Sequence, residues 1–344
     1  MITRKSFTFS QTISWSIHHI IWLVTGATVF AVGYRFDIIS LEIPWLPVSV
    51  IGTAVAFYVG FKNNQAYDRM WEARKIWGGI INNSRSWGML VDGFVSGQFT
   101  KEKISEQELR AIKRRLIYRH IGWLYAHRSQ LLIPAEWEHI KQSGLVRRYA
   151  NRMVRKFGVG LFNDEITAIE LKHYLPSDEF DGLINAQNTA TQIINTQSRE
   201  LTRLRERGII EDFRHMEMAN TLKQFYELQG KNERIKKFPL PRQYANLSRI
   251  FVGIFIFLIP FSLIPTMIEF GPWGFWLSIP TAALVGWVYV MMEVIGDYSE
   301  NPFMGMSNDI PMLSLCRTIE IDLREMLGET KLPPPIQAKN GVLM

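Results

Sequence analysis

The chain has 344 residues, with 39 lysines and arginines against 32 aspartates and glutamates, which gives a formal net charge of +7. The basic residues alternate with nearly as many acids and form no dense block with interleaved aromatics, so the charge does not indicate nucleic-acid binding. One cysteine excludes an intrachain disulfide and a cysteine-based metal site.

The first apolar run lies between Lys5 and Arg35, which enclose no formal charge. It is long enough to cross a bilayer, which needs ~20 residues per helical span. No small-residue cleavage site follows it, so we expect a retained span rather than a removed signal peptide. A second uncharged run covers residues 43–61, and its helical spacing continues past Lys62 without a helix breaker. We therefore expect one long helix that leaves the membrane and continues outside it.

No apolar run of span length occurs between residues 62 and 247. The pattern there predicts amphipathic helices that pack together outside the lipid. Asn163 and Ser177 are each followed by two acids, which is typical of helix caps with acidic first turns. The expected helices cover residues 101–127, 134–157, 164–175, 178–206 and 209–236.

Apolar runs return at residues 250–268 and 270–292. Pro260 and Pro265 are expected to kink the first of these runs, which a helix surrounded by neighbours in a membrane tolerates. After residue 293 we expect a short amphipathic helix around 315–327 and then an extended proline-rich segment.

The sequence thus predicts an all-α membrane protein with four transmembrane helices and a large cytoplasmic helical region. Its expected parts are residues 1–61 with two spans, 62–247 as the cytoplasmic region, 248–294 with two further spans, and 295–344 as a cytoplasmic tail. We expect the protein in the cell membrane, such as the bacterial inner membrane. The positive-inside rule places the basic side of the spans, with both termini, in the cytoplasm. The basic side carries Arg4, Lys5, Lys62, Arg69, Arg74, Lys75, Arg242 and Arg249, and the other side carries Arg35, Asp37, Glu42 and Glu269.

The stretch GFKNNQAYDRMWEARKIWGGIINNSRSW, from Gly60 to Trp87, resembles the bestrophin family of ion channels, especially its bacterial branch. Three further segments support this in the same order: YRHIGWLYAHRSQL at 118–131, residues 185–198, and ENPFMGMSNDIPMLSLCRTIEIDL at 300–323. The resemblance covers nearly the whole chain. It implies a bestrophin-like homopentamer around a shared pore.

Thr53, Phe57 and Phe61 fall at positions i, i+4 and i+8, so they share one face of the expected long helix. For one helix alone, contact with lipid or a neighbouring helix is the more ordinary role. Symmetric copies would instead form apolar rings, which can gate by dewetting. The resemblance implies that these residues form the hydrophobic neck of the pore. The family usually has a larger apolar residue where this chain has Thr53, so we expect a wetter outer end.

The resemblance also implies a second, cytoplasmic aperture made by one apolar side chain per subunit. Counting back from residues 230–241 places Phe213 there with Ile210 as its neighbour, although a core role for Phe213 is equally consistent with the sequence. In animal bestrophins an acidic cluster after Asn-Pro-Phe holds calcium, but this chain keeps one carboxylate there, Asp309. Calcium takes about six to eight oxygen ligands, so we expect no such site, no other metal and no cofactor, with Asp309 as a weak candidate.

Other functions remain open at this point. Glu136 and His139 have the Glu-x-x-His spacing of di-iron bundles, with Asp212 and His215 as a weaker second pair, but no constellation is complete and we expect no enzyme. A membrane-anchored scaffold is a further class. For a channel, the resemblance implies chloride or another small monovalent anion, whereas bacterial members can conduct monovalent cations such as sodium. The expected partners are further copies of the chain, these ions and the lipid bilayer.

Overall fold

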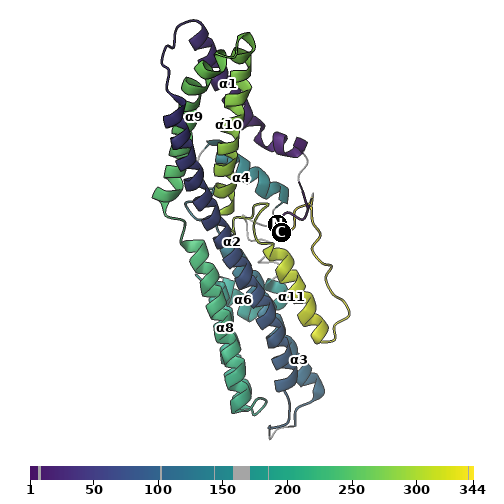
Figure 1. The fold of residues 1–344 in the computed structure, drawn as a ribbon. Helices are drawn as coiled ribbons and strands as arrows, with labels where there is room; N and C mark the ends of the chain where they lie inside the picture. Colours follow the sequence, from purple (N-terminus) through teal and green to yellow (C-terminus); the bar gives the residue numbers. More distant parts are fainter. Residues whose placement is uncertain (7–8, 101–102, 143, 158–170, 185, 340) are drawn as a thin grey trace. The chain divides into compact units, whose positions relative to one another are not determined.

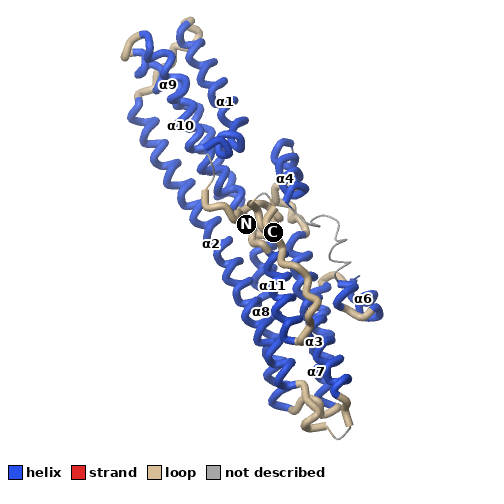
Figure 2. The backbone as a smooth tube through the Cα atoms, turned by 90° about the vertical axis from the view of Figure 1, so that its right-hand side faces the viewer, coloured by secondary structure: helices blue, strands red, loops and turns tan. Residues whose placement is uncertain are grey.

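The computed structural model describes residues 1–344 except 7–8, 101–102, 143, 158–170, 185 and 340, and its elements are α-helices joined by loops (Figure 1, Figure 2). Over these residues the only extended pairing is in isolated β-bridges, such as that between Ile2 and Val342. The chain divides into two compact units. The first, here the span unit, contains residues 4–69 and 239–300; the second, here the insert unit, contains residues 1–3, 70–238 and 301–344.

The span unit contains the helices that the four apolar runs predicted. They are α1 (Phe9–Arg35), the first part of α2 (Trp45–Phe94), α9 (Arg242–Ile268) and α10 (Pro272–Ser299). Each of the four is long and apolar enough to cross a membrane. The expected long helix is confirmed, because α2 has 50 residues and continues well past the end of its apolar run.

Small residues bring the spans of this unit close together. A Cβ atom on Gly274, near the start of α10, would lie 1.8 Å from the carbonyl oxygen of Met267, so only glycine allows this approach of α10 to the end of α9. α9 continues through Pro260 and Pro265 without ending. The larger buried cluster of the unit is made by aliphatic side chains around the Phe255 ring, and it includes Leu23, Val48, Val55, Val59, Val252, Ile259 and Val290.

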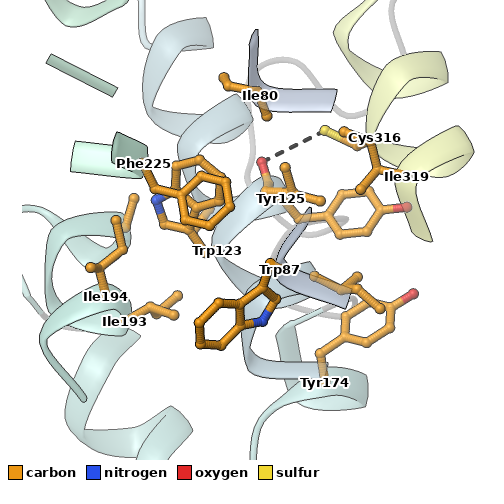
Figure 3. Packing of buried hydrophobic residues seen from close by; sticks show 14 of the residues in the cluster. Ile80, Trp87, Trp123, Tyr125, Tyr174, Ile193, Ile194, Phe225, Cys316 and Ile319 are labelled. Carbon is orange, nitrogen blue, oxygen red and sulfur yellow. Dashed lines mark hydrogen bonds between the residues drawn. The ribbon is translucent and has the colours of Figure 1, made fainter. Parts of the chain in front are cut away.

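The insert unit packs amphipathic helices around a core rich in aromatic rings. Its helices are the second part of α2, α3 (Glu106–Leu132), α4 (Gly144–Phe157), α6 (Ser177–Ile184), α7 (Thr189–Glu206), α8 (Asp212–Lys237) and α11 (Met312–Met326). Figure 3 shows Trp123 and Phe225 packed together in this core, with their ring centroids 5.0 Å apart. Burial of these rings, together with the many aliphatic side chains of the same core, drives the packing of these otherwise charged helices.

Three expected boundaries are corrected, and local capping accounts for two of them. The helix expected from residue 101 begins at Glu106, because the Ser105 side chain accepts a hydrogen bond from the Glu108 backbone at 3.2 Å. The helix expected over 178–206 is broken, because Asn188 caps a new helix by accepting from the Thr191 backbone at 2.9 Å. The helix expected from residue 134 is also wrong, since residues 136–142 form turns and α4 begins at Gly144.

Two further ends differ, because α3 continues to Leu132, past the expected end at residue 127, and α8 begins at Asp212 and not at residue 209. α6 begins at Ser177 with Asp178 and Glu179 in its first turn, as expected. Most of the helix expected over residues 164–175, with its cap Asn163, falls outside the described residues.

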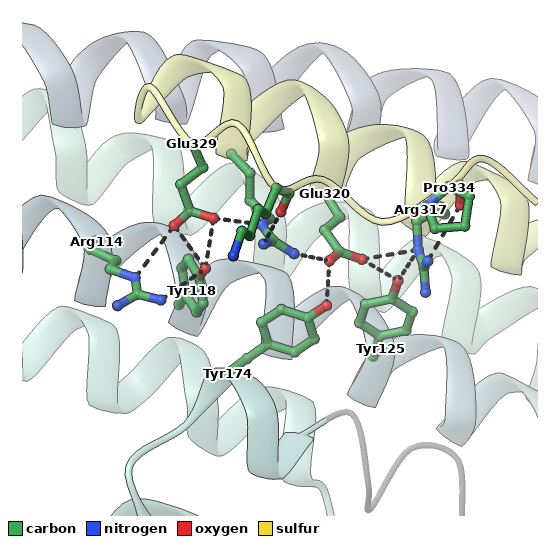
Figure 4. Close-up of polar contacts among 10 residues, drawn as sticks. Arg114, Tyr118, Tyr125, Tyr174, Arg317, Glu320, Glu329 and Pro334 are labelled. Atoms are coloured by element: carbon green, nitrogen blue, oxygen red, sulfur yellow. Dashed lines mark hydrogen bonds and ion pairs between the residues drawn. The ribbon is translucent and has the colours of Figure 1, made fainter.

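Glu320 of α11 organises a buried polar network against α3 (Figure 4). Its carboxylate accepts hydrogen bonds from the hydroxyls of Tyr125 at 2.7 Å and Tyr174 at 2.5 Å. Arg317 and Arg324, on the same helix, lie 3.1 Å and 3.0 Å from its two oxygens. The network therefore fixes the position of α11 on the insert unit by charge and hydrogen bonding, in addition to the apolar core.

Replacing Glu320 by alanine is expected to loosen α11 strongly. The change leaves two tyrosine hydroxyls and two guanidinium groups without their shared acceptor, so the loss of stability should be about 3 kcal/mol or more. Limited proteolysis of the C-terminal segment and thermal unfolding measure it. Glu325→Ala removes an exposed carboxylate from the same helix and serves as the matched control. Equal protease sensitivity of the two variants would contradict the anchoring role of Glu320.

Candidate functional site

The first part of α2 has two faces of different character. Val48, Val55 and Val59 are buried in the core of the span unit. Thr53, Phe57 and Phe61 lie on another face, where the two phenyl side chains are 66% and 61% exposed. Large apolar side chains left uncovered by their own chain require lipid or another copy of the chain to cover them, or they line a space. The structure thus places Thr53, Phe57 and Phe61, here the stripe, on one face of α2 that the rest of the chain does not cover.

The opposite face of α2 is held close to α9 and α10 at Gly52. A Cβ atom there would lie 2.7 Å from the Phe255 ring, so glycine permits a separation that no other residue would. The hydroxyl of Tyr289 donates a hydrogen bond to the Gly52 carbonyl at 3.0 Å. This contact leaves α2 little freedom to rotate, and the direction of the Thr53, Phe57 and Phe61 stripe is therefore fixed within the unit.

Thr53 is the one polar member of the stripe. Its hydroxyl donates to the carbonyl of Ser49 at 2.9 Å, one helical turn earlier. The donor is thus used within the helix, while the oxygen lone pairs and the methyl group remain for contacts outside it. Thr53 therefore binds water less strongly than a side chain whose hydroxyl hydrogen is free, but it is still more polar than an aliphatic side chain.

A buried ion pair lies directly after the stripe, and sequence reasoning missed it. The ammonium group of Lys62 lies 2.5 Å from the Glu293 carboxylate, and the Lys62 side chain has no exposed surface. Ser248 donates to the same Glu293 oxygen at 2.9 Å, and Asp297 lies 3.9 Å from the Lys62 ammonium. The pair joins α2 to α10. Its signal in the sequence was that Lys62 and Glu293 are the first charges after their apolar runs.

The two residues expected at the cytoplasmic aperture have opposite surroundings. Phe213, in the first turn of α8, is 76% exposed. Ile210 is fully buried in the core of the insert unit. Glu211 caps α8 and accepts hydrogen bonds from the backbone of Phe213 and Arg214, both at 3.2 Å. The cap holds Phe213 at the surface, so of the two residues Phe213 alone presents its side chain outside the fold.

Asp309 lies fully inside the insert unit. Its carboxylate accepts a hydrogen bond from the Met306 backbone at 3.0 Å. Burial raises the pKa of Asp309 to about 7, against the opposing effect of that hydrogen bond. Among the described residues no group of three or more histidine, cysteine, aspartate or glutamate side chains could hold a metal ion. The charged groups that interact with Asp309 are the N-terminal ammonium, Lys236 and Glu138.

Asp309→Asn is expected to remove a pH dependence of stability. The folded-state pKa lies above the ordinary value of 3.8, so the protonated native form stabilises the fold below pH 4, and this contribution is lost as the pH rises toward 7. The wild type should therefore lose stability relative to the asparagine variant between pH 4 and pH 7. Thermal unfolding at a series of pH values measures this difference. Parallel curves for the two proteins would contradict the raised pKa.

The Glu136 and His139 pair that a di-metal enzyme would need is not formed. Glu136 and His139 lie in a segment of turns and not on a helix. Glu136 is exposed and lies 3.5 Å from Lys141, while His139 is buried. The buried carboxylate in this segment is Glu138, which pairs with Lys236 at 2.5 Å. The Glu136 and His139 alternative is therefore wrong, because the segment turns where the spacing required a helix.

Comparison with known proteins bears on the chain as a whole. A family model described as "Bacterial/Fungal Bestrophin protein" matches residues 2–325. The voltage-dependent anion channel-forming protein YneE of Escherichia coli (strain K12) is 24% identical over 318 residues, which are 92% of this chain and 87% of that protein. The voltage-dependent anion channel-forming protein sll1024 of Synechocystis is 25% identical over 309 residues, which are 90% and 83%.

The fold is similar to that of solved structures over nearly the same length. A bacterial bestrophin homologue from Klebsiella pneumoniae superposes with a TM-score of 0.72 and 20% identity, covering 92% of this chain and 99% of that one. A variant of that homologue, in which one tryptophan is replaced by alanine, gives a TM-score of 0.73 and 19% identity, covering 92% of this chain and 98% of that one. The arrangement of helices is thus shared, although most of the side chains differ.

Proposed function

Because the chain belongs to the family of bacterial and fungal bestrophins, we propose that it is an ion channel that conducts small anions through a ring of identical subunits. This membership agrees with the expectation of a membrane protein that is not an enzyme. The observation that carries the proposal is the uncovered stripe of Thr53, Phe57 and Phe61 on a helix whose other face is tightly packed. A symmetric ring of subunits, with five as the expected number, would turn these stripes toward one axis.

The stripe would act on ions by controlling their hydration. Rings of phenyl side chains offer no hydrogen bonds, so an ion that passes Phe57 and Phe61 gives up part of its water shell. Weakly hydrated monovalent ions should therefore pass more easily than strongly hydrated ones. A phenyl ring carries partial positive charge at its edge, and rings that present their edges to the lumen would favour anions. The relatives named as anion channel-forming proteins support the same choice of anions as the conducted ions.

The rest of the chain would form the cytoplasmic path. We propose that the span unit crosses the cell membrane, that the insert unit lies in the cytoplasm with both termini, and that Phe213 narrows the path there with Ile210 behind it. The basic residues that flank the spans on one side support this orientation. The membrane would then hold the spans of residues 1–61 and 248–294, and the cytoplasm would hold residues 62–247 and 295–344.

Thr53→Ile is expected to lower the conductance of such a channel. Isoleucine removes the hydroxyl oxygen and adds apolar surface at the end of the neck, so the barrier to wetting rises. We expect a fall of about two- to fivefold, which corresponds to a barrier increase of ~0.4–1 kcal/mol. Single-channel recording of the purified protein in planar bilayers measures it, with Thr53→Val as the shape-matched control for the hydroxyl alone. An unchanged or larger conductance in both variants would contradict a role for Thr53 in the neck.

The test of the function is the reversal potential in asymmetric sodium chloride. An anion channel reverses near the equilibrium potential of chloride. A sodium-selective channel of the same fold reverses near the sodium potential, which has the opposite sign, and would overturn the choice of ion. A membrane-anchored scaffold passes no current in bilayers or liposomes and would overturn the channel itself.

A further inference from the structure

The span unit contains a cavity of about 530 Å³ at the end where α1 finishes and α9 turns into α10. This is the end of the spans away from their basic flanks. Its walls include Tyr34 and Arg35 from the end of α1, Asp37 from the turn that follows, and Phe275 and Trp276 from the start of α10. The volume lies in the range of sites for small organic ligands, roughly 300–1,000 Å³. The proposed conduction path uses none of these residues.

Arg35 places a positive charge at this cavity. Its guanidinium carbon lies 5.2 Å from the centroid of the Phe275 ring, which is itself buried. Within the described part of the chain no ion pair or side-chain hydrogen bond of Arg35 occurs. The N–H groups of a guanidinium lie in one plane, where they suit two oxygens of one phosphate.

Asp37 places a negative charge at the same cavity, two residues away. It has a φ of 53°, and of the described residues other than glycine it is the one with positive φ. Aspartate and asparagine are the non-glycine residues that adopt this conformation most readily, and this turn places Asp37 in the lining of the cavity. Asp37 and Arg35 form no ion pair with each other in the described structure. The lining of the cavity therefore offers one guanidinium and one carboxylate to a ligand, while a second carboxylate, that of Glu42, accepts a hydrogen bond from the Tyr34 hydroxyl.

We propose that this cavity binds the zwitterionic head group of a phospholipid, with the phosphate on Arg35 and a primary ammonium on Asp37. The lipid class with these two groups is phosphatidylethanolamine. Trp276 is largely exposed beside the cavity, and Ile268 lines it, so the glycerol and upper acyl chains have an apolar surface to follow. Tryptophan and tyrosine side chains suit this depth, where the hydrocarbon meets the head groups. The lipid is thus a ligand that the site recognises by its head group, and not only a part of the surrounding bilayer.

Titration of the detergent-purified full chain, followed by native mass spectrometry, tests the proposal. The probes are dioleoyl phosphatidylethanolamine, dioleoyl phosphatidylglycerol and the soluble head group glycerophosphoethanolamine. Wild type should bind the ethanolamine lipid about tenfold more tightly than Arg35→Gln, as expected for loss of a charged hydrogen bond. Arg35→Lys keeps the charge and should recover part of the affinity. Arg4→Gln makes the same charge change before the opposite end of α1 and should bind as wild type does.

Asp37→Asn separates the two halves of the site. This variant should lose the preference for phosphatidylethanolamine over phosphatidylglycerol and keep its affinity for the shared phosphate. Equal lipid binding by wild type and Arg35→Gln would overturn the proposal. Binding of the soluble head group as tightly as the lipid would overturn the lipid as its source and leave a site for a free phosphodiester. These readings measure lipid binding and no current, so they do not depend on the proposed channel function.

Discussion

Replacing Phe57 and Phe61 together by alanine is expected to raise the single-channel conductance several-fold. Each change removes a phenyl ring from every subunit, so the neck becomes wider and water enters it more easily. A barrier lower by ~1 kcal/mol corresponds to about a fivefold rise in rate. The current carried by strongly hydrated anions should rise more than that of weakly hydrated ones, because the lost barrier is one of dehydration. Single-channel recording with a series of halide salts measures both effects.

Phe257→Ala is the matched control for this experiment. Phe257 is an exposed phenylalanine on α9, outside the stripe, and its loss should leave the conductance unchanged. A neck elsewhere in the chain would give unchanged currents in the Phe57 and Phe61 double variant. A nonspecific effect of loosened packing would instead raise the leak of the Phe257 variant as well.

Replacing Lys62 by methionine is expected to destabilise the protein by ~3–5 kcal/mol. The change leaves the Glu293 carboxylate buried beside Ser248 without its cation, and an uncompensated buried charge is costly. Because Lys62 follows Phe61 directly, the same variant should disturb the direction of the stripe and broaden the distribution of single-channel amplitudes. Thermal unfolding of the purified protein, with recording from the same preparation, measures the two effects.

A second substitution separates loss of the pair from loss of a lysine. Adding Glu293→Gln to Lys62→Met removes both charges, so most of the stability should return, since a buried pair contributes little net stability compared with two neutral groups. Arg249→Met breaks the more exposed pair with Asp297, whose atoms are 3.6 Å apart, and should cost less than about 1 kcal/mol. A double variant as unstable as Lys62→Met would contradict the role of the pair.

The histidine and carboxylate spacings show where sequence reasoning fails. Glu136 and His139 have the spacing of metal ligands only if residues 134–142 are helical, and the chain turns there instead. Periodicity over so few residues does not distinguish a helix from a series of turns, because the contacts that decide between them come from elsewhere in the fold. Asn188 likewise begins a new helix within one expected helix, because its side chain accepts a hydrogen bond from the Thr191 backbone.

The sequence by itself determined the four membrane helices, the continuation of α2 beyond its apolar run, and the shared face of Thr53, Phe57 and Phe61. These follow from local quantities: the length of an uncharged run, the period of the α-helix and the absence of a helix breaker. Only the tertiary structure decided which face of α2 is covered, because that depends on Phe255 and Tyr289, both distant in the chain, fitting against Gly52. The pairing of Lys62 with Glu293 and the cavity at Arg35 were likewise decided by the tertiary structure alone. Each joins helices that are far apart in the sequence, and no local pattern encodes which of many distant charges or rings will meet.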